Sequence, residues 1–176
     1  RKEKDRQDFI KTINSIDTEQ LVYLDEMGVD NKQSVLRGWS IIGKPCYGEV
    51  LAYQTQRKSI LAGYYYSNRK IIAPLKYAGY TNTQIFNQWF EHHLCPGLKP
   101  KTTIIMDNAS FHKSPKLAEI AKRFNVQILY LPAYSPNLNP IEKVWANFKR
   151  ILRKVNNQFD KLEDAISYVF SIILSD

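Results

Sequence analysis

The chain has 176 residues, of which 44% are hydrophobic and 12% aromatic, and it carries a formal net charge of +8. This composition excludes a disordered or fibrous chain, and the length suits one domain with a substantial core. The excess of positive charge favours a polyanionic partner such as a nucleic acid.

The amino-terminal segment predicts a helix followed by a buried strand. Hydrophobic residues recur at helical spacing over residues 2–16, which indicates an amphipathic helix. This helix either belongs to the domain or is the tail of a missing amino-terminal module, so we divide the chain into residues 1–17 and residues 18–176. Residues 21–24 are apolar on both faces, as in a central strand, and the predicted strand ends at Asp25.

The middle of the chain predicts an irregular excursion, a hairpin and a helix. Residues 28–50 are rich in glycine and indicate irregular structure. Residues 59–66 and 70–77 are β-prone runs joined by a short turn, which is typical of a hairpin. Residues 81–84 resemble a capping box, and the helix that follows is closed by a Pro-Gly pair.

Strands and helices then alternate. Residues 102–106 are a second candidate for a buried strand, and this strand delivers Asp107 at its carboxyl end. Ser114, followed by proline, predicts the cap of a helix. Residues 126–131 form a third short apolar run.

Two more helices complete the chain. Asn139 repeats the cap-plus-proline signal before a helix over residues 141–155, and Asp160 with Glu163 predicts a capping box for the last helix. Antiparallel strands therefore come first and βαβ units later. This order predicts an α/β fold with a mixed five-stranded sheet flanked by helices.

Three widely separated acids, Asp25, Asp107 and Glu142, stand where predicted elements start or stop. The strands that precede the two aspartates can lie side by side, and the helix that starts near Glu142 can pack against the same edge. Carboxylates that converge repel one another unless cations neutralise them, and their oxygens suit Mg²⁺ or Mn²⁺ better than Zn²⁺. Two Mg²⁺ ions, with Mn²⁺ as a substitute, could polarise a phosphate and activate the attacking oxygen. The pattern therefore points towards metal-assisted phosphodiester chemistry.

Each acid also has an ordinary structural interpretation. Asp25 could begin a turn. Asp107 and the asparagine that follows it are residue types that favour turns. Glu142 could complete a capping box. Glu26 could lie in a solvated turn or act as a substitute ligand. The order of the three acids on matching elements favours the metal site.

Four blocks of sequence give the chain a family resemblance. The blocks are residues 24–28 (LDEMG), residues 37–40 with 43–44 (RGWS and GK), residues 106–114 (MDNASFHKS) and residues 131–145 (LPAYSPNLNPIEKVW). With these blocks the chain resembles the catalytic domain of the mariner-like transposases, in particular their bacterial insertion-sequence branch. The 34 residues between Asp107 and Glu142 are a spacing that these enzymes share. The resemblance extends from about residue 18 onward.

The resemblance implies a ribonuclease H-like fold and an aspartate–aspartate–glutamate triad that binds two Mg²⁺, carried over here as Asp25, Asp107 and Glu142. Such enzymes hydrolyse DNA at the ends of the element and join the freed 3′-hydroxyl to target DNA, usually at a TA dinucleotide. The implied partners are double-stranded DNA, as terminal inverted repeats and as target, and a second copy of the chain in an active homodimer. The helix-turn-helix modules that usually recognise the repeats are expected outside this sequence, unless residues 2–16 are their last helix.

Basic residues near the predicted triad, together with one histidine, are candidate DNA contacts. They are Arg37, Lys44, His112, Lys143, Lys149, Arg150 and Arg153. Cations beside a metal site would hold phosphates and make binding depend steeply on salt. A solvated helix face is the alternative for the lysines and arginines, and a surface or capping position is the alternative for His112. Trp39 fits either the core or a DNA-contacting loop, and Tyr134 either shapes the approach to Glu142 or contacts DNA.

Two other classes of function remain open. An inactive or domesticated DNA-binding descendant fits a chain without recognition modules. A ribonuclease H-type nuclease would add a fourth acid and lack the proline-rich block at residues 131–140.

Apolar runs, the amino end and the cysteines indicate the cellular compartment in which we expect the protein. No apolar run reaches the roughly 18–20 residues that span a bilayer, and the charged amino end is not a signal peptide. Cys46 and Cys95 are not spaced as a zinc site or a disulfide framework. We therefore expect a cytoplasmic protein, associated with the bacterial nucleoid when bound to DNA, and no membrane partner.

Overall fold

A five-stranded sheet forms the centre of the molecule in the computed structural model, which describes residues 2–30, 40–45 and 57–174. The strands are β1 (Leu21–Asp30), β2 (Arg57–Tyr65), β3 (Ile71–Ala78), β4 (Thr103–Met106) and β5 (Gln127–Tyr130). Their order across the sheet is β3-β2-β1-β4-β5. The β1–β2 and β2–β3 pairs are antiparallel, whereas the β1–β4 and β4–β5 pairs are parallel. The predicted mixed sheet of five strands is confirmed.

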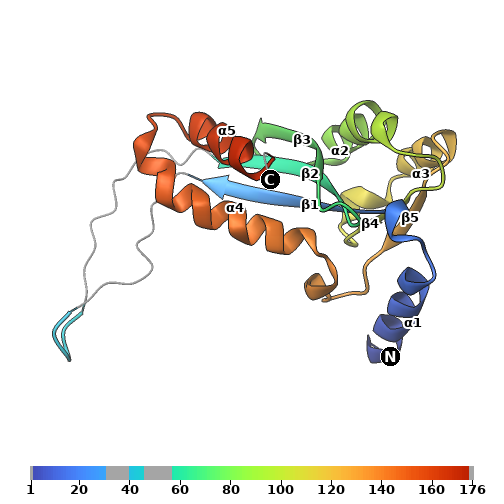
Figure 1. The fold of residues 1–176 in the computed structure, drawn as a ribbon, viewed down its shortest axis with the longest axis horizontal. Coiled ribbons are helices and arrows are strands. Elements are labelled where there is room, and N and C mark those ends of the chain that lie inside the picture. The colour runs from blue at the N-terminus through green and yellow to red at the C-terminus, as the bar shows by residue number, and fades with distance from the viewer. Residues whose placement is uncertain (1, 31–39, 46–56, 175–176) are drawn as a thin grey trace.

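Five α-helices surround the sheet in the described part of the chain (Figure 1). They are α1 (Lys2–Asn14), α2 (Thr83–Trp89), α3 (Pro115–Arg123), α4 (Ile141–Val155) and α5 (Leu162–Ile173). A π-helical turn over Phe90–Leu94 extends α2. Short 3-10 turns link several elements, including Pro136–Leu138 just before α4.

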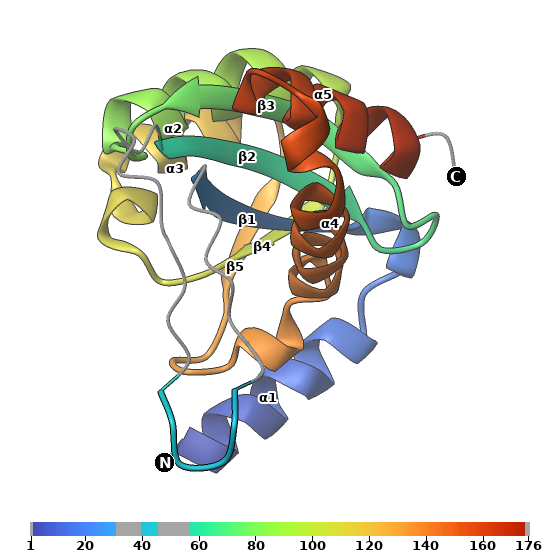
Figure 2. The same cartoon turned by 90° about the vertical axis from the view of Figure 1, so that its left-hand side faces the viewer.

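The alternation of side chains along β1 divides the core into two layers. Leu21, Tyr23 and Met27 face one cluster, which contains the buried residues of α4 and α5. Val22 and Leu24 face the other, which contains the buried aromatic residues of α2 and the apolar stripe of α3. Figure 2 shows the resulting arrangement, with α4 and α5 together on one side of the sheet and α2 and α3 on the other.

Strand β1 is longer than the sequence predicts. It continues through Asp25 and Glu26 as far as Asp30, because antiparallel pairing with β2 continues over its whole length. The prediction that the strand ends at Asp25 is therefore wrong, and so is the start of the excursion at residue 28. Pairing across the sheet outweighs the low strand propensity of two adjacent acids.

The helix caps agree with the sequence in part. Ser114 caps α3 as predicted, since its Oγ accepts a hydrogen bond from the Leu117 N–H at 3.2 Å. Asn82, within the predicted capping box, caps α2 by accepting from the Ile85 N–H at 2.9 Å. The box predicted from Asp160 is wrong, because α5 starts without a side-chain cap. Its Glu163 instead pairs with the Lys58 ammonium at 2.5 Å.

Helix α1 packs against the α4 side of the sheet. Phe9 is 6% exposed and belongs to the same core cluster as α4 and α5, with Ile13 and Ile16 packed beside it. Of the helices in the described ranges, none combines the length and the apolar character that crossing a membrane requires.

Candidate active site

Asp25 lies inside β1, on the face that α4 covers. The strand alternates side chains between faces, so Asp25 shares its side with Tyr23 and Met27 rather than with Leu24. Glu26 consequently points to the opposite face. There its carboxylate accepts hydrogen bonds from the hydroxyls of Ser59 and Thr81. Glu26 is thus held away from Asp25, and the structure does not favour it as a substitute ligand.

Asp107 directly follows β4, the parallel neighbour of β1. Its Oδ1 accepts a hydrogen bond from the Ala109 N–H at 3.0 Å, which fixes a local turn. The same oxygen lies 2.7 Å from Nδ1 of His112. These bonds leave the second oxygen, Oδ2, available to a ligand, while the turn and the histidine orient the carboxylate.

His112 is buried rather than exposed. Only 4% of its surface is accessible, and its ring packs against Phe86 and Phe111 at centroid distances of 4.3 Å each. The interpretation as a direct DNA contact is therefore corrected, because the ring lies inside the α2 layer and its Nδ1 faces Asp107. His112 instead orients the carboxylate of Asp107 from inside the core.

Glu142 is the second residue of α4, and the turn before it is tied to β1. Asn139 does not cap the helix. Its Nδ2 donates to the carbonyl oxygen of Leu24 at 3.2 Å, across 115 positions of the chain. The capping-box interpretation of Glu142 is therefore wrong. The bond instead fixes the turn that carries Glu142 beside the strand that carries Asp25.

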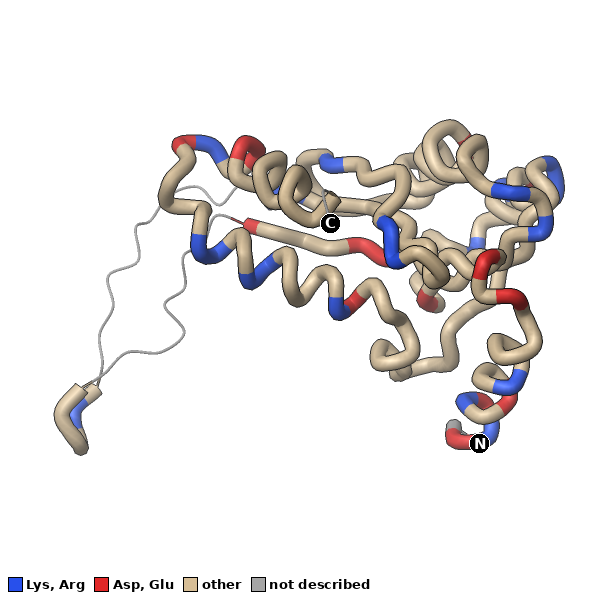
Figure 3. Tube along the Cα trace, viewed as in Figure 1, with Lys and Arg blue, Asp and Glu red and all other residues tan. Residues whose placement is uncertain are grey.

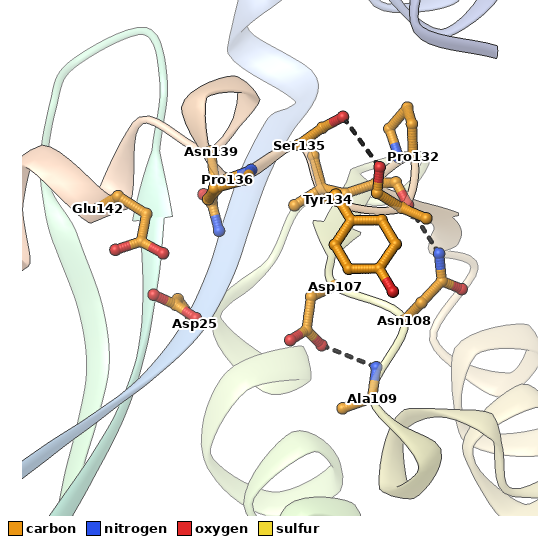
Figure 4. A pocket seen from close by; sticks show the side chains of 12 residues that line it. Asp25, Asp107, Asn108, Ala109, Pro132, Tyr134, Ser135, Pro136, Asn139 and Glu142 are labelled. Carbon is orange, nitrogen blue, oxygen red and sulfur yellow. Dashed lines mark hydrogen bonds between the residues drawn. The ribbon is translucent and has the colours of Figure 1, made fainter. Parts of the chain in front are cut away.

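The three acids line one open cavity of about 390 Å³. Its other walls come from the end of β4 and the loop after β5: Asn108, Ala109, Leu131, Pro132, Ala133, Tyr134, Ser135, Pro136 and Asn139. Figure 4 shows the carboxylates of Asp25 and Glu142 turned toward each other, with Asp107 beside them on the neighbouring element. The sequence therefore selected three acids that the fold brings to one place.

Electrostatics agree with this convergence. Burial, together with repulsion from Glu142 and Asp107, raises the pKa of Asp25 to about 7. The pKa of Asp107 is lowered, chiefly because the His112 side chain hydrogen-bonds its carboxylate. Within the described ranges no Lys or Arg forms an ion pair with Asp25, so its ionised form is disfavoured, and a bound divalent cation would relieve this.

The donor set suits a hard cation. Carboxylate oxygens are the ligands that Mg²⁺ and Mn²⁺ prefer. Among the residues that the structure describes, however, no three His, Cys, Asp or Glu side chains stand close enough to enclose an ion. The acids line the cavity as an open arrangement rather than as a closed cage.

Several side chains that support the site escaped prediction. Asn108 Nδ2 donates to the Leu131 carbonyl at 2.7 Å, and Arg6 of α1 donates to Ser135 Oγ and Asn137 Oδ1 at 3.1 Å each. The only sequence signal for these roles was the cluster of asparagines and prolines itself. The partners are far apart in the chain, so local patterns do not reveal the pairs.

The basic candidates lie away from the cavity. Lys143, Arg150 and Arg153 are exposed on α4, and Lys149 is partly buried. Lys149 and Arg153 instead line a second cleft of about 230 Å³ with Arg57, Gly28 and Asp30. Lys44 is exposed and does not line either cavity. Arg37 and Trp39 fall outside the described residues.

A model of the family described as DDE superfamily endonuclease matches residues 20–166. The chain belongs to this family. The match extends from β1 into the first half of α5, so it contains all three acids of the cavity.

Known transposases are similar to this DDE endonuclease domain. The Transposable element Tcb2 transposase of Caenorhabditis briggsae is 40% identical over 63 residues, which are 33% of this chain and 23% of that protein. The crystal structure of the Mos1 Strand Transfer Complex matches with a TM-score of 0.75 and 14% identity, over 99% of this chain and 53% of that chain. The Mos1 mariner paired end complex with Mn matches with a TM-score of 0.71 and 14% identity, over 100% of this chain and 54% of that chain.

The structural similarity confirms the ribonuclease H-like α/β fold, with its mixed sheet flanked by helices. The chain spans about half the length of the Mos1 chains and about a quarter of the Tcb2 transposase.

Proposed function

We propose that this DDE endonuclease domain is the catalytic domain of a DNA transposase. It hydrolyses phosphodiester bonds at the transposon ends and transfers the freed 3′-hydroxyl into target DNA. The observation that carries the proposal is the meeting of Asp25, Asp107 and Glu142, from three separate elements, around one cavity. The family match and the similarity to the Mos1 strand transfer complex support it.

The proposed metal ligands are Asp25, Asp107 and Glu142, and the proposed cofactor is a pair of Mg²⁺ ions with Mn²⁺ as a substitute. Bound divalent ions would polarise the phosphate and stabilise the attacking and leaving oxygens. The protein's own part is to hold the carboxylates ready. His112 orients Asp107, and Asn139 fixes the position of the Glu142 turn against β1.

The proposed partner is double-stranded DNA, as terminal inverted repeats and as target. Cations of α4, the helix that carries Glu142 at its start, would hold the phosphates: the exposed Lys143, Arg150 and Arg153 and the partly buried Lys149. Arg37 and Lys44 are retained as candidate contacts of the segment between β1 and β2. We propose an active homodimer in the cytoplasm, acting on DNA of the bacterial nucleoid. We also propose that residues 18–176 carry the catalytic residues, with α1 packed against them.

Nicking of a supercoiled plasmid tests the proposal. We expect Mg²⁺ and Mn²⁺ to support nicking and Ca²⁺ to support DNA binding alone. The Asp107→Asn variant keeps the side-chain volume but loses the charged ligand, so nicking should fall by about 100-fold or more while binding in Ca²⁺ persists. Asp160→Asn, at an exposed aspartate outside the cavity, is the matched control and should nick like the parent.

Three other outcomes of the nicking experiment would each point to a different conclusion. Equal nicking by the parent and Asp107→Asn would show that the cavity is not the active site. Binding in Ca²⁺ without nicking in Mn²⁺ would identify a DNA-binding descendant that has lost catalysis. Faster cleavage of an RNA–DNA hybrid than of duplex DNA would favour a ribonuclease H-type nuclease.

A further inference from the structure

A second cleft lies at the carboxyl-terminal end of β1, beyond Asp25. It has a volume of about 230 Å³, and its lining includes the cations of Arg57, Lys149 and Arg153 and the carboxylate of Asp30. Figure 1 shows this end of β1, marked by its arrowhead, beside the carboxyl-terminal half of α4. Cations from two elements, β2 and α4, thus line one cleft and outnumber its carboxylate.

The guanidinium of Arg57 is held in place at this cleft. It lies over the ring of Tyr80, with 4.4 Å between the guanidinium carbon and the ring centroid. On β1 the same group lies against Gly28, where an added Cβ would come within 2.5 Å of Nη2. A guanidinium is a planar fork of donors, so fixing its plane prepares it to bind two oxygens of one phosphate. The missing side chain of Gly28 leaves the space that the guanidinium occupies.

The three cations of the cleft are available to a ligand. Among the residues that the structure describes, no ion pair involves Arg57, Lys149 or Arg153. Arg57 and Arg153 are exposed and Lys149 is partly buried, so a ligand can reach them from solvent. Cations gathered in a cleft attract an anion, and guanidinium groups favour a phosphate because its oxygens match the spacing of their donors.

Helix α4 and strand β1 give the same distance between this cleft and the carboxylates. Along α4, a rise of about 1.5 Å per residue puts Lys149 about 10 Å beyond Glu142. Along β1, a rise of about 3.3 Å per residue puts Gly28 and Asp30 about 10 and 16 Å beyond Asp25. Each strand of duplex DNA advances about 3.4 Å per phosphate, so the distance corresponds to about three to five nucleotides.

We propose that this cleft binds one phosphodiester group of the DNA duplex, about three to five nucleotides from the phosphate that lies at the carboxylates. This inference rests on the proposed function and adds Arg57, which the sequence did not identify, to the DNA contacts. The fork of Arg57 binds the phosphate oxygens, and Lys149 and Arg153 neutralise the charge from α4. A contact at a fixed distance from the carboxylates determines which bond of a bound strand reaches them.

Cleavage interference tests the position of this contact. A labelled linear duplex carries one uncharged methylphosphonate linkage at its centre and is cut by the full chain in Mn²⁺. Each cut marks where the carboxylates lay, so its distance from the neutral linkage is known whatever the sequence. We expect cuts about three to five nucleotides from that linkage to fall by on the order of tenfold, because a charge-assisted contact is lost there.

Variants at Arg57 and Gly28 assign the interference to the cleft. Arg57→Gln removes the cation, and Gly28→Ala displaces the flexible end of the arginine while it keeps the net charge, so both should lose most of the interference. Two matched controls should keep it. Arg69→Gln changes an exposed arginine that does not line the cleft, and Gly97→Ala adds a Cβ with nothing within 4 Å.

Binding to the unmodified duplex in Ca²⁺ provides a readout that needs no cleavage. Arg57→Gln should lower the slope of log K against log salt by up to about 0.9, the contribution of one phosphate contact. Arg69→Gln should leave the slope unchanged. An equal slope for Arg57→Gln and the parent would overturn the assignment of the cleft.

Failure of this proposal and failure of the proposed function give different results. If Asp107→Asn abolishes cutting while Arg57→Gln keeps the parent's interference, or alters cuts only at other distances, the transposase proposal stands and the phosphate site is wrong. If cutting does not depend on Asp107, the cavity is not the active site and both proposals are wrong.

Discussion

Asp25 carries a carboxylate into a strand that is otherwise largely apolar. Its neighbours Leu24 and Met27 are each 1% exposed, and no described cation hydrogen-bonds or ion-pairs with its carboxylate. Burial, Glu142 and Asp107 together raise its pKa to about 7. An acid in this environment destabilises the metal-free fold when ionised, and such a cost is typical of a residue kept for function.

The stability of the metal-free protein should therefore fall as the pH rises. Between the ordinary pKa of 3.8 and the folded value of about 7, the native state keeps a proton on Asp25 that the unfolded chain releases. The full destabilisation is present above pH 7 and absent below about pH 4. Asp25→Asn removes it, so the variant should unfold with a free energy higher by about 2–4 kcal/mol at pH 8 and nearly unchanged at pH 4. Urea unfolding in EDTA at both pH values measures the difference.

Added Mn²⁺ provides the complementary readout. It should stabilise the parent at pH 8 because it neutralises the carboxylates, and it should stabilise Asp25→Asn less. Asp160→Asn, which removes an exposed carboxylate outside the cavity, is the control for Mn²⁺ binding and should be stabilised by Mn²⁺ as much as the parent. Two results would contradict the assignment of the pH-dependent destabilisation to Asp25. In the first, Asp25→Asn is less stable than the parent at pH 8; in the second, it changes the free energy of unfolding equally at both pH values.

The sequence identified the three acids but not how they are held. Asp25, Asp107 and Glu142 could be chosen because their order and spacing match predicted elements. Asn139 looked like a helix cap, since local pattern cannot reveal a bond to Leu24 across 115 positions. His112 looked like a surface residue because its burial depends on α2, which comes from elsewhere in the chain.

At the scale of elements, α4 links the acidic cavity to a basic cleft. Lys149 and Arg153 follow Glu142 by seven and eleven residues, close to two and three helical turns, so the three side chains share one face of α4. The rise of the helix puts the two cations about 10 and 16 Å beyond Glu142 along its axis. Figure 3 shows basic positions recurring along α4, which has a single acidic position near its start. A DNA strand that reaches the cavity would thus pass over positive charge.

Neutralising these two cations should reduce the salt dependence of DNA binding. Each phosphate contact contributes about 0.9 to the slope of log K against log salt, so Lys149→Gln with Arg153→Gln should lower the slope by up to about 2. Binding in Ca²⁺ at several salt concentrations measures it. The matched control is Lys116→Gln with Lys122→Gln on α3, which covers the other face of the sheet. If the two double variants gave equal slopes of log K against log salt, Lys149 and Arg153 of α4 would not contact the DNA phosphates.

The mixed sheet and the pairing of β1 with β4 could be anticipated because antiparallel strands precede βαβ units, and short apolar runs located β4 and β5. The length of β1 could not, since Gly28 and Asp30 near its end are poor strand formers that β2 pairs into the sheet. A side chain at Gly28 would meet the guanidinium of Arg57, with the nearest atom 2.5 Å from the added Cβ. The end of the strand thus depends on a tertiary contact that only the fold creates.

At the scale of the whole molecule, the relation of α1 to the rest of the chain decides where the domain begins. The sequence left two options for residues 1–17, an integral helix or the tail of a preceding module. In the structure, Phe9 enters the core shared by α4 and α5, and Arg6 bonds the loop that precedes Glu142. These contacts favour an integral helix, and they would also transmit a movement of any preceding segment to the loop of the active site.

A pair of adjacent substitutions in α1 tests this integration. Phe9 is 6% exposed, whereas Ile10 next to it is 40% exposed. If α1 is part of the domain, Phe9→Ala removes a buried aromatic side chain and should lower the free energy of unfolding by about 3 kcal/mol, and Ile10→Ala should lower it by less than about 1 kcal/mol. Urea denaturation followed by fluorescence provides both values. Equally small effects for the two variants would instead mean that α1 does not contribute to the stability of the domain, and the boundary after residue 17 would then separate two independent parts.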